Sequence, residues 1–261
     1  MRAENPAGPA PILSVRDLTK IYRHQNQDGI TAADHISFDL YPGECLGIIG
    51  ESGSGKSTVA GMITRLTDPT SGTIVLDGQD ITLLRGRQLR DVYAKIQMVF
   101  QTPADSFDPR HTLGDGIGES LRNRGRSIRE TRQEVERLLT LCGLSPYYAS
   151  RYPHQVSGGQ CQRAAIARAL AVSPQILICD EATSALDVTI QKEMITLLDR
   201  LRKKLGLSII FICHDIALVQ EFCDRVLVMH RGKIVEEGIP DEIIKNPKDP
   251  YTKNLIDSVL L

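Results

Sequence analysis

Short apolar runs alternate along the chain with longer segments in which apolar residues recur every three or four positions. The first pattern is typical of buried β-strands and the second of helices that bury one face. Strands are predicted at 12–18, 36–40, 45–49, 73–76, 96–100, 176–179 and 208–213, and as a hairpin at 226–229 and 233–235. Strands that alternate with helices predict an α/β fold with a mostly parallel sheet, whose ligands bind where the strands end.

Three helical segments carry apolar residues on one face. The helix after Lys56 is expected to end near Pro69, because proline cannot continue it, and another runs to Gly206, which is placed to cap it. From about 102 to 149, alternating Arg and Glu at helical spacing predict a helical insertion with a solvated face rather than a basic patch. The apolar positions are Val59, Met62, Ile63 and Leu66 in the first helix, Val135, Leu138, Leu139 and Cys142 in the insertion, and Ile190, Met194, Leu197, Leu198, Leu201 and Leu205 in the last.

A glycine-rich segment between the strand at 45–49 and the helix after it fits the pattern G-x-x-x-x-G-K-[ST]. It reads Gly50, Glu51, Ser52, Gly53, Ser54, Gly55, Lys56, Ser57, Thr58. Glycines let the backbone N–H groups turn inward, and the following helix presents its positive N-terminus to the same anion. Lys56 then reaches the β- and γ-phosphates of a nucleotide, and the Ser57 hydroxyl is offered to Mg²⁺.

Two carboxylates end the buried strand at 176–179, and a histidine ends the next one. Asp180 is predicted to hold Mg²⁺, and Glu181 to act as the base that polarises the attacking water. His214 is placed to contact the γ-phosphate. The alternative, that these are ordinary polar groups at strand ends, is disfavoured because all of them follow strands that should reach the phosphate loop.

Composition narrows the classes of function. The 261 residues are 41% hydrophobic and 24% charged with a net charge of −1, which argues against a nucleic-acid binder. Six cysteines without a C-x-x-C pair indicate reduced, buried thiols. Residues 1–11 are polar, so we expect a flexible tail rather than a signal peptide. The longest apolar run, 209–213, is too short to span a bilayer, so any membrane role must involve a partner.

A second candidate anion site precedes a predicted helix at 162–171. Ser157, Gly158, Gly159 and Gln160 place a hydroxyl and two glycines at a helix N-terminus. Because the phosphate loop already completes one site, this segment is either a simple helix cap or a site for the nucleotide of another subunit. The residues alone leave both readings open.

The run from Arg151 to Arg163, Arg-Tyr-Pro-His-Gln-Val-Ser-Gly-Gly-Gln-Cys-Gln-Arg, resembles the signature region of ABC-transporter ATPase subunits. The resemblance extends over nearly the whole chain. Gly50–Thr58 resembles the Walker A motif of that family, Asp180-Glu181 its Walker B motif, Ser184–Asp187 its D-loop, Gln101 its Q-loop glutamine, His214 its switch histidine, and Tyr22 the aromatic residue that stacks on adenine. Val156 replaces the usual Leu and leaves the Ser-Gly-Gly segment intact.

The resemblance implies a RecA-like P-loop core with a small antiparallel β subdomain and an inserted helical subdomain. The expected domains are an ATPase domain at 12–240, with the helical part at about 102–165, and a C-terminal helical tail at 241–261. Cofactors are ATP and Mg²⁺, with Ser57, Asp180 and Gln101 near the metal. Two ATP molecules would lie in a head-to-tail dimer, each between one subunit's Walker A and the other's Ser157–Gln160, with Asp187 at the same interface.

The segment 100–110 and the tail 246–255, which contains Pro247, Pro250, Tyr251 and Thr252, resemble the di-/oligopeptide and nickel importer branch of the family. Thr102 and Asp249 depart from its usual Asp and His. The implied protein is an importer motor at the cytoplasmic face of the membrane. Its partners would be two transmembrane permease subunits, a second ATPase chain and, indirectly, an extracytoplasmic substrate-binding protein. The alternatives are a soluble ABC-type mechanochemical ATPase of translation or DNA repair and an exporter motor; no N-K-x-D motif supports a GTPase.

Overall fold

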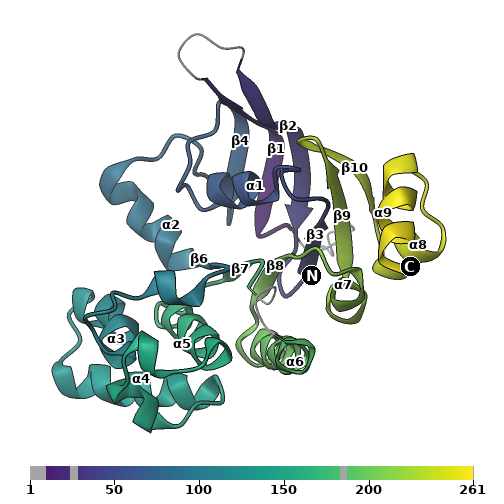
Figure 1. The fold of residues 1–261 in the computed structure, drawn as a ribbon. Helices are drawn as coiled ribbons and strands as arrows, with labels where there is room; N and C mark the ends of the chain where they lie inside the picture. Colours follow the sequence, from purple (N-terminus) through teal and green to yellow (C-terminus); the bar gives the residue numbers. More distant parts are fainter. Residues whose placement is uncertain (1–9, 24–28, 183–186, 261) are drawn as a thin grey trace, which may run out of the picture.

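A computed structural model describes residues 10–23, 29–182 and 187–260. In these residues the chain forms two β-sheets, helices packed on both faces of the larger sheet, and a separate helical lobe at one end (Figure 1). The N-terminal strands lie at the opposite end of the molecule from this lobe, and the C-terminal helices lie at one side.

The larger sheet has six strands in the order β10-β9-β3-β8-β7-β6 within the described residues. The strands β9, β3, β8, β7 and β6 are parallel, and only the edge strand β10 runs antiparallel to its neighbour. Every residue of β3 and β8 is buried, which explains why both read as continuous apolar runs. The bounds are β3 (Cys45–Ile49), β6 (Ile96–Val99), β7 (Ile176–Asp180), β8 (Ser208–Ile212), β9 (Arg225–His230) and β10 (Lys233–Gly238).

Side chains of this sheet alternate between two hydrophobic cores. Ile178 and Ile210 point toward α1 and the smaller sheet, whereas Leu177 and Phe211 point toward the helices of the other face. The helices that cover the sheet are α1 (Lys56–Ile63) on the first face, and α5 (Gly158–Leu170), α6 (Val188–Leu205) and α7 (Ile216–Phe222) on the second. As predicted, Gly206 ends α6 with a left-handed φ of 67°.

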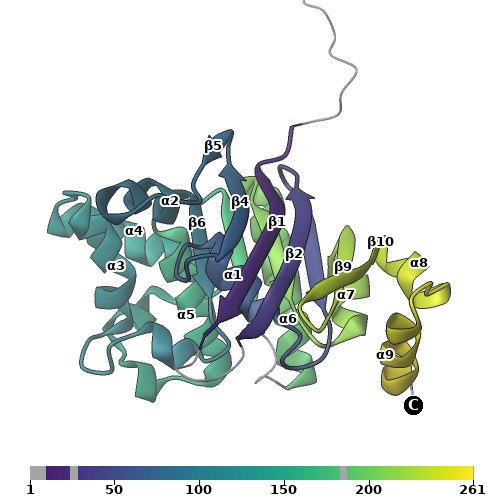
Figure 2. The same cartoon turned by 90° about the horizontal axis from the view of Figure 1, so that it is seen from above.

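The smaller sheet is antiparallel and runs β2-β1-β4-β5 (Figure 2). Its first two strands are longer than the sequence predicts, because pairing with each other carries them past the apolar residues that revealed them. Strand β1 continues through Tyr22, beyond residue 18, where the predicted strand ends. The bounds are β1 (Leu13–Tyr22), β2 (Ile30–Leu40), β4 (Ser71–Leu76) and β5 (Gln79–Asp80).

The helical lobe contains α3 (Leu113–Asn123) and α4 (Ile128–Leu141), packed on α5. Both begin with a capping box, from Thr112 to Asp115 and from Ser127 to Glu130. The predicted apolar face of α4 is confirmed, since Val135, Leu138, Leu139 and Cys142 are all buried. Other helical segments are α2 (Leu89–Lys95), α8 (Pro240–Lys245), α9 (Pro250–Leu260), and the 3₁₀ turns Gly86–Gln88, Pro103–Ser106, Pro146–Ser150 and Pro153–Gln155.

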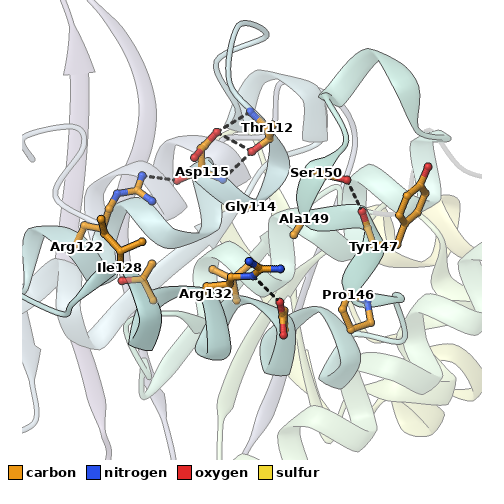
Figure 3. Close-up of a pocket in the computed structure, with 13 residues that line it drawn as sticks. Thr112, Gly114, Asp115, Arg122, Ile128, Arg132, Pro146, Tyr147, Ala149 and Ser150 are labelled. Carbon is orange, nitrogen blue, oxygen red and sulfur yellow. Dashed lines mark hydrogen bonds and ion pairs between the residues drawn. The ribbon is translucent and has the colours of Figure 1, made fainter.

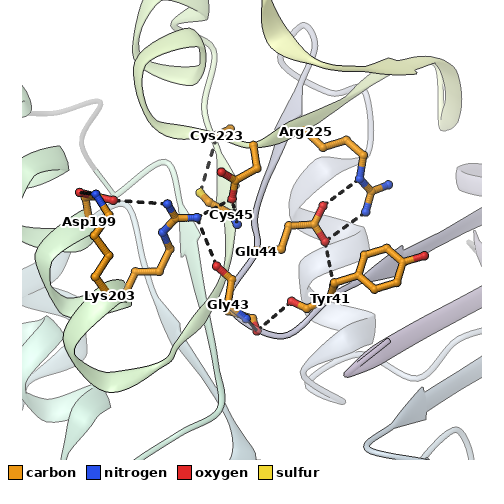
Figure 4. Close-up of polar contacts among 11 residues, drawn as sticks. Tyr41, Gly43, Glu44, Cys45, Asp199, Lys203, Cys223 and Arg225 are labelled. Carbon is orange, nitrogen blue, oxygen red and sulfur yellow. Dashed lines mark hydrogen bonds and ion pairs between the residues drawn. The ribbon is translucent and has the colours of Figure 1, made fainter. Parts of the chain in front are cut away.

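A polar network holds the amino end of the central strand β3 (Figure 4). Arg202 of α6 pairs with Asp224, and the Asp224 carboxylate also accepts the N–H of Cys45 at 2.8 Å. On the other side, Arg225 donates to Glu44 at 2.8 Å. These contacts join α6, the start of β9 and the β2–β3 turn, so the strand that leads to the phosphate loop is anchored where it begins.

Helix α1 ends earlier than the sequence predicts. Its last residue is Ile63, because Arg65 adopts a left-handed φ of 58° and turns its buried side chain to Asp68, which it reaches at 2.8 Å. Leu66, which was predicted to belong to the apolar face, therefore lies outside the helix and is 59% exposed.

We expect Ile63→Ala to lower the free energy of unfolding by about 2–5 kcal/mol, because Ile63 is fully buried. Leu66→Ala, at an exposed position just after the helix, is the matched control. It should change the free energy of unfolding by no more than about 0.5 kcal/mol. Urea unfolding of the two variants measures the difference. Equal losses would show that Leu66 is packed against the core.

Candidate nucleotide-binding site

The glycine-rich loop between β3 and α1 is shaped by backbone conformation and by close contact with two other strands. Gly50, Gly53 and Gly55 have φ values of 146°, 80° and 105°, which side chains disfavour. A Cβ on Gly50 would lie 2.1 Å from the Met229 carbonyl oxygen, and one on Gly55 would lie 2.1 Å from that of Ala32. Strands β9 and β2 thus leave room for glycine only at these two positions.

Lys56 begins α1 and is only 4% exposed. Its ammonium donates to the carbonyl oxygens of Gly50 and Glu51, each at 2.8 Å. Burial lowers the pKa of Lys56, although Glu181 and Asp180 nearby oppose the shift. The ammonium is therefore held across the loop, inside the curve where a phosphate group would bind.

Asp180 ends β7 beside the start of α1. The Ser57 hydroxyl donates to its carboxylate at 3.1 Å, which joins residues from two distant segments. Burial raises the pKa of Asp180, while the Ser57 hydrogen bond and the positive charge of Lys56 oppose the shift. A hydroxyl and a half-buried carboxylate are oxygen ligands suited to Mg²⁺, which takes its remaining ligands from water and nucleotide phosphates. The residues present thus fit the ion.

Strand register brings the other predicted catalytic residues to the same edge of the sheet. Ile212 pairs with both Ile48 and Asp180, so Glu181 and His214 follow neighbouring strand ends close to the loop. Glu181 has a left-handed φ of 48° and donates its N–H to the Ile212 carbonyl at 3.0 Å. Such strain is characteristic of functional positions.

Gln101 occupies the next place along this edge. It follows β6, in which Val99 pairs with Cys179 of β7, and its side chain is exposed. The strand order therefore places Gln101 beside the end of β7, while its contact with metal or phosphate stays a prediction.

Comparison with known proteins identifies the family. The sequence profile of the ABC transporter family matches residues 33–184, more than half of the chain. The chain belongs to the ABC transporter family. Membership confirms the prediction, made from the signature and Walker segments, of an ATP-binding, ATP-hydrolysing subunit.

Two oligopeptide transport proteins are similar in sequence to this ABC ATPase over most of its length. The oligopeptide transport ATP-binding protein OppF of Salmonella typhimurium is 46% identical over 232 residues, which are 88% of this chain and 70% of OppF. OppF of Bacillus subtilis is 44% identical over 235 residues, 89% of this chain and 77% of its own.

Solved structures confirm the predicted fold class. CbiO1 from Clostridium perfringens, part of an ABC transporter complex, has a TM-score of 0.80 at 31% identity and covers 90% of this chain and 91% of its own. The ATP-binding cassette MJ0796, a dimer bound to ADP and phosphate, has a TM-score of 0.80 at 31% identity and covers 87% of this chain and 98% of its own.

The predicted signature segment lies at the start of α5. Ser157 caps α5, its hydroxyl accepting the Gln160 N–H at 3.3 Å while the Gln160 side chain accepts the Ser157 N–H at 3.0 Å. Gly158 and Gly159 form the first turn. Because α5 and α1 pack on opposite faces of the sheet, Ser157 and the glycine-rich loop start helices on different faces.

The remaining predicted residues are partly described. Tyr22 ends β1 and is 40% exposed, with the Lys20 ammonium 5.0 Å from its ring centre. Asp187 caps α6 by accepting the Ile190 N–H at 3.0 Å, while 184–186 of the predicted D-loop lie outside the described residues. Within the loop, Ser52 is exposed, Ser54 is buried and Thr58 is half-buried.

Among the hollows in the helical lobe, two are lined by residues of α3. The larger, about 520 Å³, lies between α3, α4 and the turn 146–150, and Ile128, Arg132 and Tyr147 line it (Figure 3). The second, about 320 Å³, is lined by Phe107 and Arg168 among others. It adjoins the segment that follows Gln101, so the hollow and the predicted catalytic edge are linked by a short stretch of chain.

Sequence reasoning missed one contact with the loop. The Tyr251 hydroxyl accepts the N–H of Glu51 at 2.9 Å. Tyr251 belongs to the tail motif that indicated the importer branch, but nothing in the sequence indicates which part of the fold that motif touches.

We expect Gly55→Ala to weaken ATP binding at least about tenfold, a loss of roughly 1.4 kcal/mol, because the new Cβ would collide with the Ala32 carbonyl and distort the loop. Gly43→Ala is the matched control: Gly43 also has a positive φ, 75°, but its Cβ would meet no atom within 4 Å. That variant should lose about 1–2 kcal/mol of stability at most and keep its affinity. Titration with a fluorescent ATP analogue measures both; equal affinity of the two variants would contradict the steric argument.

Proposed function

We propose that this chain is the ATP-hydrolysing motor subunit of an importer for oligopeptides. The observation that carries the proposal is the 46% identity to OppF over 88% of the chain, in a protein whose Walker A loop and Asp180–Glu181 pair meet at one sheet edge. Both OppF relatives are named oligopeptide transport ATP-binding proteins, so peptides are proposed as cargo in preference to nickel chelates. A soluble mechanochemical ATPase and an exporter are not favoured.

The residues of the site support a division of roles. Backbone N–H groups of the loop and the N-terminus of α1 bind the phosphates, and Lys56 turns from its two carbonyl partners to the β- and γ-phosphates. Ser57 and Asp180 would hold Mg²⁺, which would neutralise phosphate charge. The carboxylate of Glu181 accepts a proton from the attacking water, and His214 and Gln101 orient the water and γ-phosphate from the neighbouring strand ends.

The position of the signature segment supports a head-to-tail dimer. Ser157–Gln160 start a helix on the face of the sheet opposite to α1, so they are suited to the nucleotide of a second ATPase subunit. Asp187, which caps α6, is proposed to lie at the same interface. MJ0796, at 31% identity, forms a dimer that binds ADP and phosphate. The second subunit is a copy of this chain or a sister chain.

Transport requires membrane partners. In the described ranges, no helix is long and apolar enough to cross a membrane. The identity to OppF supports our proposal that the protein lies peripherally at the cytoplasmic face of the membrane. There it would bind two permease subunits that receive cargo from an extracytoplasmic substrate-binding protein. The hollow beside Phe107 is the proposed permease contact, because it adjoins the segment that follows Gln101 and can transmit changes at the γ-phosphate.

Glu181→Gln should lower ATP turnover by about 10²–10⁴ and leave ATP binding intact, because the amide cannot accept the proton of the attacking water. ATP should then hold the variant as a dimer, which size-exclusion chromatography detects. Glu221→Gln, at an exposed position on α7, is the matched control and should hydrolyse ATP normally. Unchanged turnover in Glu181→Gln would remove Glu181 from the role of base.

The importer role is tested by purifying the tagged chain from detergent-solubilised native membranes and identifying its partners by mass spectrometry. We expect two multi-span permeases, an ATPase subunit and a peptide-binding protein. Recovery of ribosomes or DNA-repair enzymes without membrane proteins would contradict the importer and favour the soluble motor.

A further inference from the structure

The C-terminal tail contacts the phosphate loop directly. Helix α9 begins at Pro250, and its second residue, Tyr251, places its hydroxyl 2.9 Å from the backbone nitrogen of Glu51, which donates the hydrogen bond. Glu51 is the residue after Gly50, where the loop leaves β3. A segment outside the strands and helices of the nucleotide core thus determines where one loop amide points.

The ring of Tyr251 is held by stacking and its backbone by a helix cap. Its ring stacks on His230 at the end of β9, with ring centres 3.8 Å apart and planes at 3°. The Asp249 carboxylate accepts the Tyr251 N–H at 2.8 Å and caps the first turn of α9, while Pro250 presets the backbone there. Asp249, which departs from the usual branch residue, thereby keeps the tyrosine oriented by hydrogen bonding.

The tail is itself tied to the larger sheet. The carboxylate of Glu236 in β10 accepts the N–H groups of Lys248 and Asp249 at 2.9 and 3.0 Å. Burial opposes the charge, yet these two donors hold the pKa of Glu236 below its ordinary value. Thr252 and Ile256, which belong to α9, are buried. The segment that carries Tyr251 is therefore anchored on both sides of the tyrosine.

The hydrogen bond from Glu51 gains importance because of the peptide group to which it belongs. The Gly50 carbonyl of the same peptide accepts from the Lys56 ammonium at 2.8 Å. One peptide plane is thus held by Tyr251 on its N–H side and by Lys56 on its carbonyl side. Because Gly50 lacks a side chain and has a φ of 146°, its backbone has more freedom to rotate than any other residue would.

We infer that Tyr251 is a positioning residue for nucleotide binding: its hydroxyl holds the Gly50–Glu51 peptide so that the loop and Lys56 are preorganised for phosphate. The inference rests on the proposed nucleotide site and extends it to the tail. Without the hydroxyl the peptide rotates more freely, and part of the binding free energy is spent on ordering it. Tyr251 touches neither nucleotide nor metal in this role.

Tyr251→Phe tests the inference, because it keeps the ring on His230 and removes only the hydroxyl. We expect the dissociation constant for N-methylanthraniloyl-ADP with Mg²⁺, and the KM for ATP, to rise about threefold to tenfold, the range for one hydrogen bond. The kcat at saturating ATP should stay within about twofold. Tyr93→Phe on α2, which belongs neither to the phosphate loop nor to the tail, is the matched control and should behave as wild type.

A double-mutant cycle separates positioning from simple stabilisation of the tail. Glu236→Gln should weaken nucleotide binding when Tyr251 is present and have little further effect in Tyr251→Phe. The reason is that Glu236 holds the tail and acts on the Gly50–Glu51 peptide only through the Tyr251 hydroxyl. Independent effects of the two substitutions would overturn the inference, as would a dissociation constant in Tyr251→Phe within twofold of wild type. The melting temperature of nucleotide-free Tyr251→Phe should match wild type; a lowered one with unchanged affinity would assign Tyr251 a structural role only.

The wild-type protein and Lys56→Ala serve as references. Lys56→Ala should lose nucleotide binding itself. If wild type binds nucleotide and Tyr251→Phe binds equally well, only the role of Tyr251 is refuted. If wild type fails to bind, the nucleotide site is refuted, and the inference with it.

Discussion

The parallel hydrogen bonding of β3, β8 and β7 is the constraint on which the site depends. Ile212 pairs with Ile48 on one side and with Asp180 on the other, so three strands end at the same level. The phosphate loop, the acidic pair and His214 follow directly from those ends. Asp180, Glu181 and His214 lie at the ends of β7 and β8 or within two residues of them, and the phosphate loop begins directly after β3.

Electrostatics explain why this edge is suited to a charged ligand. Lys56 is buried and Asp180 is half-buried, and burial shifts the pKa of each toward the neutral form. A phosphate beside Lys56 and a divalent cation beside Asp180 would each supply the opposite charge that these groups lack. In the structure, the Lys56 ammonium donates to loop carbonyls and Asp180 accepts from Ser57.

Much of this arrangement was predictable from the sequence because it depends on neighbours in the chain. The apolar runs revealed the buried strands, and Gly50 and Gly55 revealed the turn between β3 and α1. Predictions failed where pairing or side-chain contacts overrode local pattern. Strand β1 extends through Tyr22 because β2 pairs with it, and α1 stops at Ile63 because Arg65 turns back to form contacts with the following segment.

The sequence by itself therefore determined the class of fold, the phosphate loop, the acidic pair and the family. Only the tertiary structure decided which groups confine that loop. The Met229 and Ala32 carbonyls that exclude a Cβ come from other strands, and Tyr251 comes from the end of the chain. The structure likewise shows that Ser157 starts a helix on the opposite face of the sheet from α1. Such contacts join residues far apart in sequence, and their geometry follows from packing rather than from any local pattern.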